Sequence, residues 1–169
     1  MKTAIRAIGP EYNTNRMVRQ YTEEMYLPAL HRSEILTENN LNRAKQLAAW
    51  KQNLRSNWSA LKILNTKIDM HDGLKVGDEL GIHTWLDLGK LKPEDVTVEI
   101  FFGPLDAKGD IDSAKTLSLT FHNKTNDGAY EFIGTIRLET SGRMGHTVRV
   151  LPKHPDIDSP FHEGLILWA

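Results

Sequence analysis

The spacing of apolar residues changes once along this 169-residue chain, near residue 62, and that change constrains the fold most. Before it, apolar residues recur three and four positions apart, which is typical of amphipathic helices. After it, they alternate with polar residues, which is typical of strands in a sheet with one solvent-facing side. The alternating runs cover residues 79–88, 96–102, 117–121, 130–138 and 148–150, and residues 61–68 are a candidate first strand. The sequence therefore predicts a helical N-terminal segment and a β-rich remainder.

Two helices are predicted in the N-terminal segment. The first begins at Asn13 or Thr14, whose side chains can accept hydrogen bonds from free backbone N–H groups. It is expected to end at Pro28, because proline lacks an N–H and clashes with the preceding turn. The second opens near Thr37 and runs to about Ala60. One face of the first helix is apolar and has no partner in its own segment; its residues are Met17, Val18, Tyr21 and Met25. We predict that this face contacts a partner.

Turn-forming residues separate the alternating runs of the second part. They are Gly103-Pro104, Gly109-Asp110, Asn126-Asp127-Gly128 and Ser141-Gly142. Six to seven short strands without helices between them predict an antiparallel, immunoglobulin-like β-sandwich rather than alternating strands and helices. The predicted fold class is mainly β, with a helical segment over residues 1–60 and a β-sandwich domain over residues 61–169.

Composition and charge exclude several classes of protein. A net charge of −1 without a basic block argues against nucleic acid or an anionic membrane as partner. The chain has no cysteine, which rules out disulfides, thiolate nucleophiles and zinc–thiolate sites. No apolar run approaches the ~20 residues needed to cross a bilayer. We therefore expect a cytoplasmic protein.

Motifs for catalysis or cofactor binding are missing from the sequence. It contains neither Gly-x-Ser-x-Gly nor Gly-x-Gly-x-x-Gly, and no phosphate loop. The seven histidines show no metal-ligand spacing. Asp106, Asp110 and Asp112 offer oxygen ligands for calcium, but their spacing does not match an EF-hand loop. We predict no catalytic, cofactor-binding or metal-binding residues in this chain.

Two aromatic residues, Trp85 and Phe101, are predicted to point outward from their strands. Exposed flat rings on a β-sandwich can stack on pyranose rings, which makes both residues candidate sugar contacts. Packing beneath the second helix is the favoured alternative, because Trp50 and Trp58 of that helix also need a surface. Arg143 and Arg149 present a similar choice: each guanidinium can bind a partner's phosphate or carboxylate, but a cross-strand ion pair with a surface glutamate is the simpler interpretation.

Blocks of residues along nearly the whole chain share the order and spacing of one known family. They include Val76-Gly77-Asp78 and Phe102-Gly103-Pro104-Leu105, and they cover residues 5–21, 26–29, 76–78, 88–99, 102–105, 141–155 and 164–169. In this order they resemble the C-terminal region of the α-glucan (glycogen/starch) phosphorylases of bacteria and archaea, which belong to a glycosyltransferase superfamily.

The resemblance implies a parent enzyme that degrades α-1,4-glucan to glucose 1-phosphate with pyridoxal phosphate. In that family the cofactor lysine lies in a motif well upstream, and this chain has no such motif. The resemblance therefore implies a non-catalytic C-terminal domain with a structural or interaction role, whose partners are the upstream catalytic domains. A glucan-binding module with Trp85 and Phe101 as contacts is the alternative, and self-association into a homo-oligomer is left open.

Overall fold

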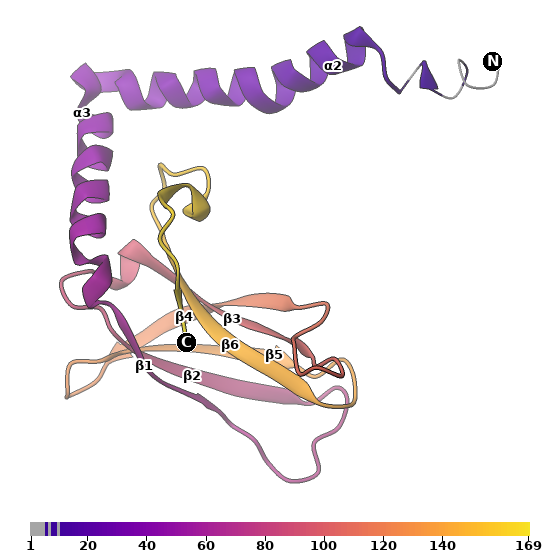
Figure 1. The fold of residues 1–169 in the computed structure, drawn as a ribbon. Coiled ribbons are helices and arrows are strands. Elements are labelled where there is room, and N and C mark those ends of the chain that lie inside the picture. Colours follow the sequence, from indigo (N-terminus) through magenta and orange to yellow (C-terminus); the bar gives the residue numbers. More distant parts are fainter. Residues whose placement is uncertain (1–5, 7, 10) are drawn as a thin grey trace. The chain divides into compact units, whose positions relative to one another are not determined.

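The computed structural model describes residues 6, 8, 9 and 11–169. The chain divides into two compact units, Met1–Trp50 and Lys51–Ala169. Helices come first and strands follow (Figure 1), which confirms the predicted mainly β class. The helical elements are α2 (Thr14–Tyr21), the π-helical turn η1 (Thr22–Tyr26) and α3 (Leu27–Asn57).

Helix α2 begins as predicted, but Pro28 does not end the helical run. Asn13 caps α2, because its side-chain oxygen accepts the backbone N–H of Arg16 at 2.8 Å. The π-helical turn η1 comes just before Pro28, and in it the N–H of Leu27 donates to the carbonyl of Thr22, five residues back. We attribute the passage of the helix through proline to this wider turn, which changes the hydrogen-bond pattern where the ring would otherwise clash.

The interruption of the helix lies further along, inside α3. Residues 38–41 have non-helical backbone angles, and Asn39, Asn40 and Leu41 have positive φ values of 50°, 58° and 63°. Asparagine tolerates this left-handed conformation better than most residues do. Figure 1 shows the bend in α3 that results. Two separate helices divided at Pro28 are therefore not confirmed. None of the helices in the described ranges is both long and apolar enough to cross a membrane.

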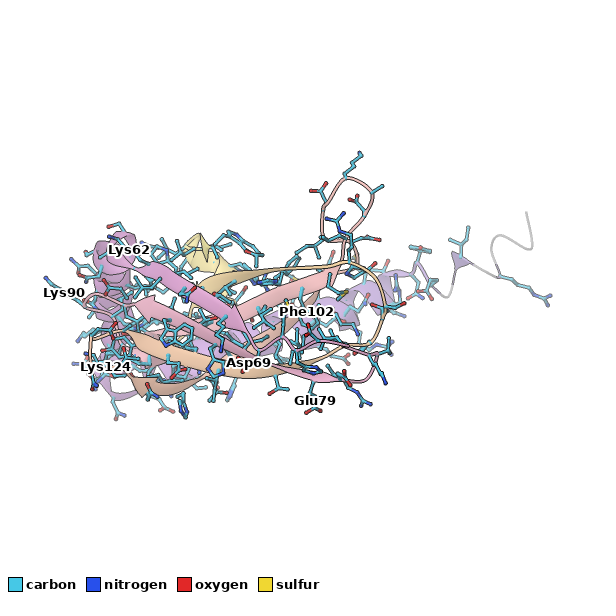
Figure 2. All side chains as sticks on the ribbon, turned by 90° about the horizontal axis from the view of Figure 1, so that it is seen from below. Lys62, Asp69, Glu79, Lys90, Phe102 and Lys124 are labelled. Atoms are coloured by element: carbon cyan, nitrogen blue, oxygen red, sulfur yellow. The ribbon has the colours of Figure 1, made fainter. Side chains whose placement is uncertain are left out.

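Seven antiparallel strands make up most of the second unit. They are β1 (Lys62–Ile68), β2 (Glu79–Asp87), β3 (Val96–Pro104), β4 (Lys115–Lys124), β5 (Tyr130–Arg137), β6 (Met144–Pro152) and β7 (Leu167–Trp168). Three short 3₁₀ turns accompany them: η2 (Trp58–Ala60), η3 (Pro93–Asp95) and η4 (Pro160–Glu163). Because the strands alternate in direction, Lys62, Lys90 and Lys124 lie at one end of the sheet and Asp69, Glu79 and Phe102 at the other (Figure 2).

Strand β4 changes its partner halfway along its length. Residues 115–119 pair with β3, and residues 120–124 pair with β5. The strand order is therefore β1-β2-β5-β4-β3-β6-β7, a nearly closed, barrel-like arrangement with β1 and β7 at its ends. The predicted number of strands and their antiparallel pairing are confirmed, whereas the immunoglobulin-like sandwich geometry is not.

The core of the second unit follows the predicted alternation in β2 and β3. Every second residue is buried from Leu80 to Leu86 and from Val96 to Ile100, namely Leu80, Ile82, Thr84, Leu86, Val96, Val98 and Ile100. Phe102, the last residue of the run predicted for β3, is only partly buried. Phe121 departs from the prediction, since it was expected to face inward with Leu119 but is 41% exposed. A bulge between Phe121 and Asn123 and the partner change of β4 break the alternation at this point.

Candidate interaction surfaces

The apolar side of the first helical turns is open to solvent. Met17, Val18, Tyr21 and Met25, here called the α2 face, are between 46% and 57% exposed. No described residue of α2 or η1 is buried. Covering the exposed half of each of these side chains would contribute roughly 1 kcal/mol per residue to binding. The structure thus brings the four predicted partner-facing residues together on neighbouring helical turns.

An arginine with aromatic neighbours occupies the outer side of β3, β6 and β7. The Arg149 cluster consists of Glu99, Phe101, Arg149, Phe161 and Trp168. Arg149 Nε donates to Glu99 Oε2 at 2.6 Å across the β3–β6 pairing, which confirms the cross-strand ion pair. The guanidinium lies 5.9 Å from the ring centre of Phe101 and 5.6 Å from those of Phe161 and Trp168. Cation–π attraction and partial burial therefore stabilise this pair.

The Arg149 cluster changes the interpretation of Phe101. The ring of Phe101 meets Trp168 edge to face, with ring centres 5.8 Å apart, and Arg149 lies over it. The exposed rings of the cluster are instead Phe161 and Trp168, at 50% and 46%. Sequence reasoning missed both, because they lie outside the alternating runs. The signal for Trp168 was the block at residues 164–169 that carried part of the family resemblance, and Phe161 lies outside that block.

Trp85 lies on the outer side of β2, away from Phe101. Its ring stacks on His83, with centres 5.9 Å apart and an interplanar angle of 17°. His83 is in turn held between two carboxylates, Asp69 at 3.3 Å and Glu131 at 2.9 Å. Strands β5 and β4 separate β2 from β3, so the structure does not bring Trp85 and Phe101 together. The ring of Trp85 contacts a ring of its own strand, and the ring of Phe101 contacts a ring of β7.

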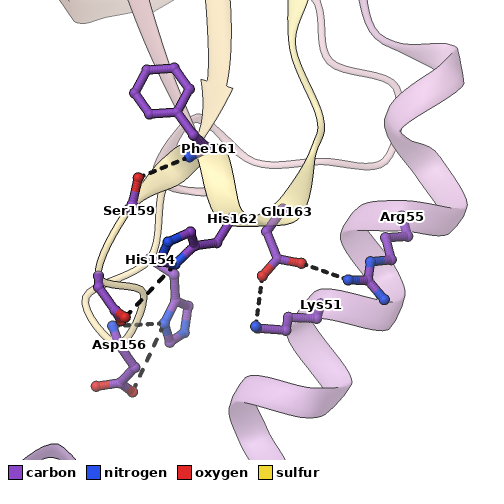
Figure 3. A network of polar contacts seen from close by, with 9 residues as sticks. Lys51, Arg55, His154, Asp156, Ser159, Phe161, His162 and Glu163 are labelled. Carbon is purple, nitrogen blue, oxygen red and sulfur yellow. Dashed lines mark hydrogen bonds and ion pairs between the residues drawn. The ribbon is translucent and has the colours of Figure 1, made fainter. Parts of the chain in front are cut away.

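A buried carboxylate holds the last turns of α3 to the C-terminal segment. The Glu163 clamp consists of Glu163, whose side chain is only 2% exposed, with Lys51 Nζ at 2.6 Å and Arg55 Nη2 at 3.1 Å (Figure 3). The hydrogen bond from Lys51 lowers the pKa of Glu163 below its ordinary value, against the opposing effect of burial. Ser159 caps η4 beside it by accepting the N–H of Phe161. The clamp is a structural feature, and it lies wholly within the second unit.

Carboxylates and lysines of the described residues bear on whether this chain could hold a metal or pyridoxal phosphate. In this part of the chain no group of three or more His, Asp or Glu is placed to hold a metal ion. Asp106 instead accepts hydrogen bonds from the backbone N–H groups of Lys108 and Asp110.

Pyridoxal phosphate needs a lysine amine in an enclosed site with donors for its phosphate. Lys115 is ion-paired with Glu139 and exposed. Lys153 is exposed at an open groove. Neither of these two lysines fits that need.

Comparison with known proteins identifies relatives along the whole chain. Residues 58–169 match the family described as glycogen phosphorylase C-terminal domain. The chain is 30% identical over 171 residues to glycogen phosphorylase of Mycobacterium tuberculosis (strain CDC 1551 / Oshkosh), covering 100% of the chain and 20% of that protein. It is 29% identical over 171 residues to maltodextrin phosphorylase of Thermococcus litoralis, covering 99% of the chain and 20% of that protein. The chain thus spans about a fifth of the length of these relatives.

Solved structures are less similar. The alkylpurine DNA glycosylase AlkC of Pseudomonas fluorescens aligns with 74% of this chain and 39% of its own, at 17% identity and a TM-score of 0.35. That likeness is too low to support any statement about fold or function. The family match, by contrast, covers well over half of the chain and confirms the resemblance seen in its sequence. The chain belongs to the family of glycogen phosphorylase C-terminal domains.

Proposed function

We propose that this chain is a non-catalytic interaction domain of an α-glucan phosphorylase, and that the α2 face binds the catalytic portion of that enzyme. By catalytic portion we mean the four fifths of the curated relatives that lie outside the match. The observation that carries the proposal is the open α2 face, with four apolar side chains about half exposed on one helix. An amphipathic helix commonly binds by laying such a face into an apolar groove.

The family supports the choice of partner. Relatives with the same C-terminal domain are named glycogen phosphorylase and maltodextrin phosphorylase, so each joins this domain to a much longer body. The charge of −1 gives no preference for a strongly charged partner, whereas the apolar helix face favours a protein surface. In this proposal pyridoxal phosphate and the catalytic residues belong to that body. A cytoplasmic location and self-association stay predictions.

Mixing experiments test the proposal directly. The chain is mixed with the separately expressed catalytic portion of the M. tuberculosis relative, and complex formation is followed by sedimentation velocity. The relative's own C-terminal fifth is the positive control. We expect a complex with the chain, weakened at least about tenfold by Met17→Ser with Tyr21→Ser, since two apolar anchors are lost. Gln20→Ser, an exposed position on the same helix, is the matched control and should leave affinity unchanged.

The result that would contradict the proposal is equally specific. It is a folded chain that forms no complex under conditions in which the relative's own C-terminal fifth does. Equal binding by the Met17/Tyr21 double variant would contradict the α2 face as the contact surface.

The strand connections favour an immunoglobulin-like sandwich, which we propose as the finer description of the second unit. With β1–β7 taken as A–G, the neighbours β1-β2-β5-β4 and β3-β6-β7 correspond to the ABED and CFG sheets of that fold. A crystal structure with two sheets packed about 10 Å apart would support this description. Hydrogen bonds between β1 and β7 would contradict it, because they close a barrel.

Glucan binding through Trp85 and Phe101 is the alternative function. Trp85 favours it, since its ring lies at a hollow of about 300 Å³ lined in part by Asn65, Thr125 and Asp127. The two residues lie on different parts of the sheet, so they would act as independent contacts. Titration with maltooligosaccharides, followed by tryptophan fluorescence, should quench Trp85 if this alternative holds. An unchanged signal up to millimolar sugar would contradict it.

A further inference from the structure

A groove opens in the sheet where β4 changes its partner. Pairing of β3 with β4 ends at Val98 and Leu119, and pairing of β4 with β5 begins at Thr120. The start of β3 and the end of β4 therefore separate, and a hollow of about 490 Å³ lies there. We call it the β4 groove. Its volume falls within the range of roughly 300–1,000 Å³ that is typical of small-molecule sites.

The floor of the β4 groove is apolar and carries one exposed ring. Val96, Leu119 and Phe132 line it and are buried. Phe121 stands beside them with 41% of its surface exposed. Its ring is supported by Phe132, with centres 5.8 Å apart, and by Tyr130 at 6.1 Å. Phe121 is thus a fixed, partly exposed aromatic surface rather than a free side chain.

The rim of the β4 groove is polar, and its side chains have no partners within the described part of the chain. Hydroxyl groups come from Thr97, Ser118 and Thr120, and charges come from Glu94 and Lys153. Each hydroxyl can both donate and accept a hydrogen bond. One carboxylate and one ammonium leave the rim without net charge. Unpaired polar groups around an apolar floor are the arrangement expected of a binding site.

We propose that the β4 groove binds a neutral sugar ring. The apolar C–H face of a pyranose matches the ring of Phe121, and its hydroxyls match the donors and acceptors of the rim. A charged ligand has no advantage here, because Glu94 and Lys153 balance each other. The site is distinct from Trp85 and Phe101, neither of which lines the groove. The choice of an α-1,4-linked probe rests on the proposed function.

The test is a titration of the ¹⁵N-labelled full chain with maltoheptaose, followed by amide chemical shifts. We expect shifts at residues 94–97, 118–121 and 153. Phe121→Ala should weaken binding roughly five- to tenfold, the range expected for loss of one aromatic contact. Phe121→Tyr should retain binding. Trp85→Ala and Phe101→Ala are the matched controls and should bind as the unchanged chain does. Thr120→Val keeps the side-chain shape without the hydroxyl, and should weaken binding even if Phe121→Ala fails to fold.

Three results would overturn this inference. They are no shifts up to millimolar maltoheptaose, shifts centred on Trp85 or Phe101, and normal binding by both Phe121→Ala and Thr120→Val. The same variants should form a normal complex with the catalytic portion. For the unchanged chain, absence of sugar shifts with an intact complex would contradict this inference alone, and absence of the complex with intact sugar shifts would contradict the proposed function alone.

Discussion

The strands of the second unit bury their apolar side chains against one another, whereas the helix of the first unit leaves its apolar side chains in water. Ile82, Val98 and Ile100 have no exposed surface, while Met17 and Tyr21 keep nearly half of theirs. Side chains of similar apolar character are therefore buried in the second unit and exposed in the first. The difference shows which region is complete: the sheet provides its own partners, and the α2 face has none among the described residues of its unit.

The Glu163 clamp involves residues near the start of the second unit, whose apolar side chains pack against one another. It joins the last turns of α3 to the segment before β7, so those turns belong with the strands. Leu54, on the same turns, has no exposed surface. Trp50 and Trp58, expected to need a surface to pack on, are only partly buried. The side chains of α3 are thus mostly exposed in its first turns, and some of them are buried in its last turns.

The largest expected effect comes from opening the core of the sheet. Ile100→Ala should lower the free energy of unfolding by about 2–5 kcal/mol, because it removes buried methylene groups and leaves a cavity. Urea unfolding followed by tryptophan fluorescence measures this change. A loss below about 1 kcal/mol would mean that the sheet does not carry the stability of the second unit.

Removal of the buried carboxylate should have a smaller effect. Glu163→Ala should lower the free energy of unfolding by about 1–2 kcal/mol, since Lys51 and Arg55 lose their partner but still reach water. Glu139→Ala is the matched control, because Glu139 and Lys115 form an exposed pair that contributes little. Equal losses in the two variants would show that the Glu163 clamp is no stronger than a surface pair.

The same carboxylate predicts a pH dependence. Because the folded-state pKa of Glu163 is lowered from its ordinary value of 4.5, its contribution is fully present above that value. It is lost as pH falls through the lower, folded-state pKa. The stability difference between the unchanged chain and Glu163→Gln should therefore shrink between about pH 5 and pH 3. A difference that stays constant over this range would contradict the lowered pKa.

The smallest effect on stability is expected at the α2 face. Met17→Ser with Tyr21→Ser should change the free energy of unfolding of the second unit by less than about 0.5 kcal/mol, because these side chains are not buried in the chain itself. Thermal unfolding followed by circular dichroism checks this. A loss comparable to that of Ile100→Ala would mean that the α2 face stabilises this chain rather than a complex.

The inward-facing residues of β2 and β3 were predictable, because alternation along the sequence fixes which side chains share a face of a strand. Their partners were not, because alternation carries no information on pairing. The switch of β4 after Leu119, and with it the exposure of Phe121, depends on β3 and β5 together. The Glu163 clamp joins residues 108 positions apart, beyond any local pattern. The helix passes Pro28 through a π-helical turn, which no propensity scale indicated.

Amide hydrogen exchange is the most direct test of whether the α2 face binds the catalytic portion, because it reports on this face in the intact chain. Exchange is measured with and without the catalytic portion of a phosphorylase. Residues 14–26 should exchange more slowly in the mixture, with the amides of β2 and β3 unchanged. Slower exchange confined to the strands, with residues 14–26 unaffected, would contradict it.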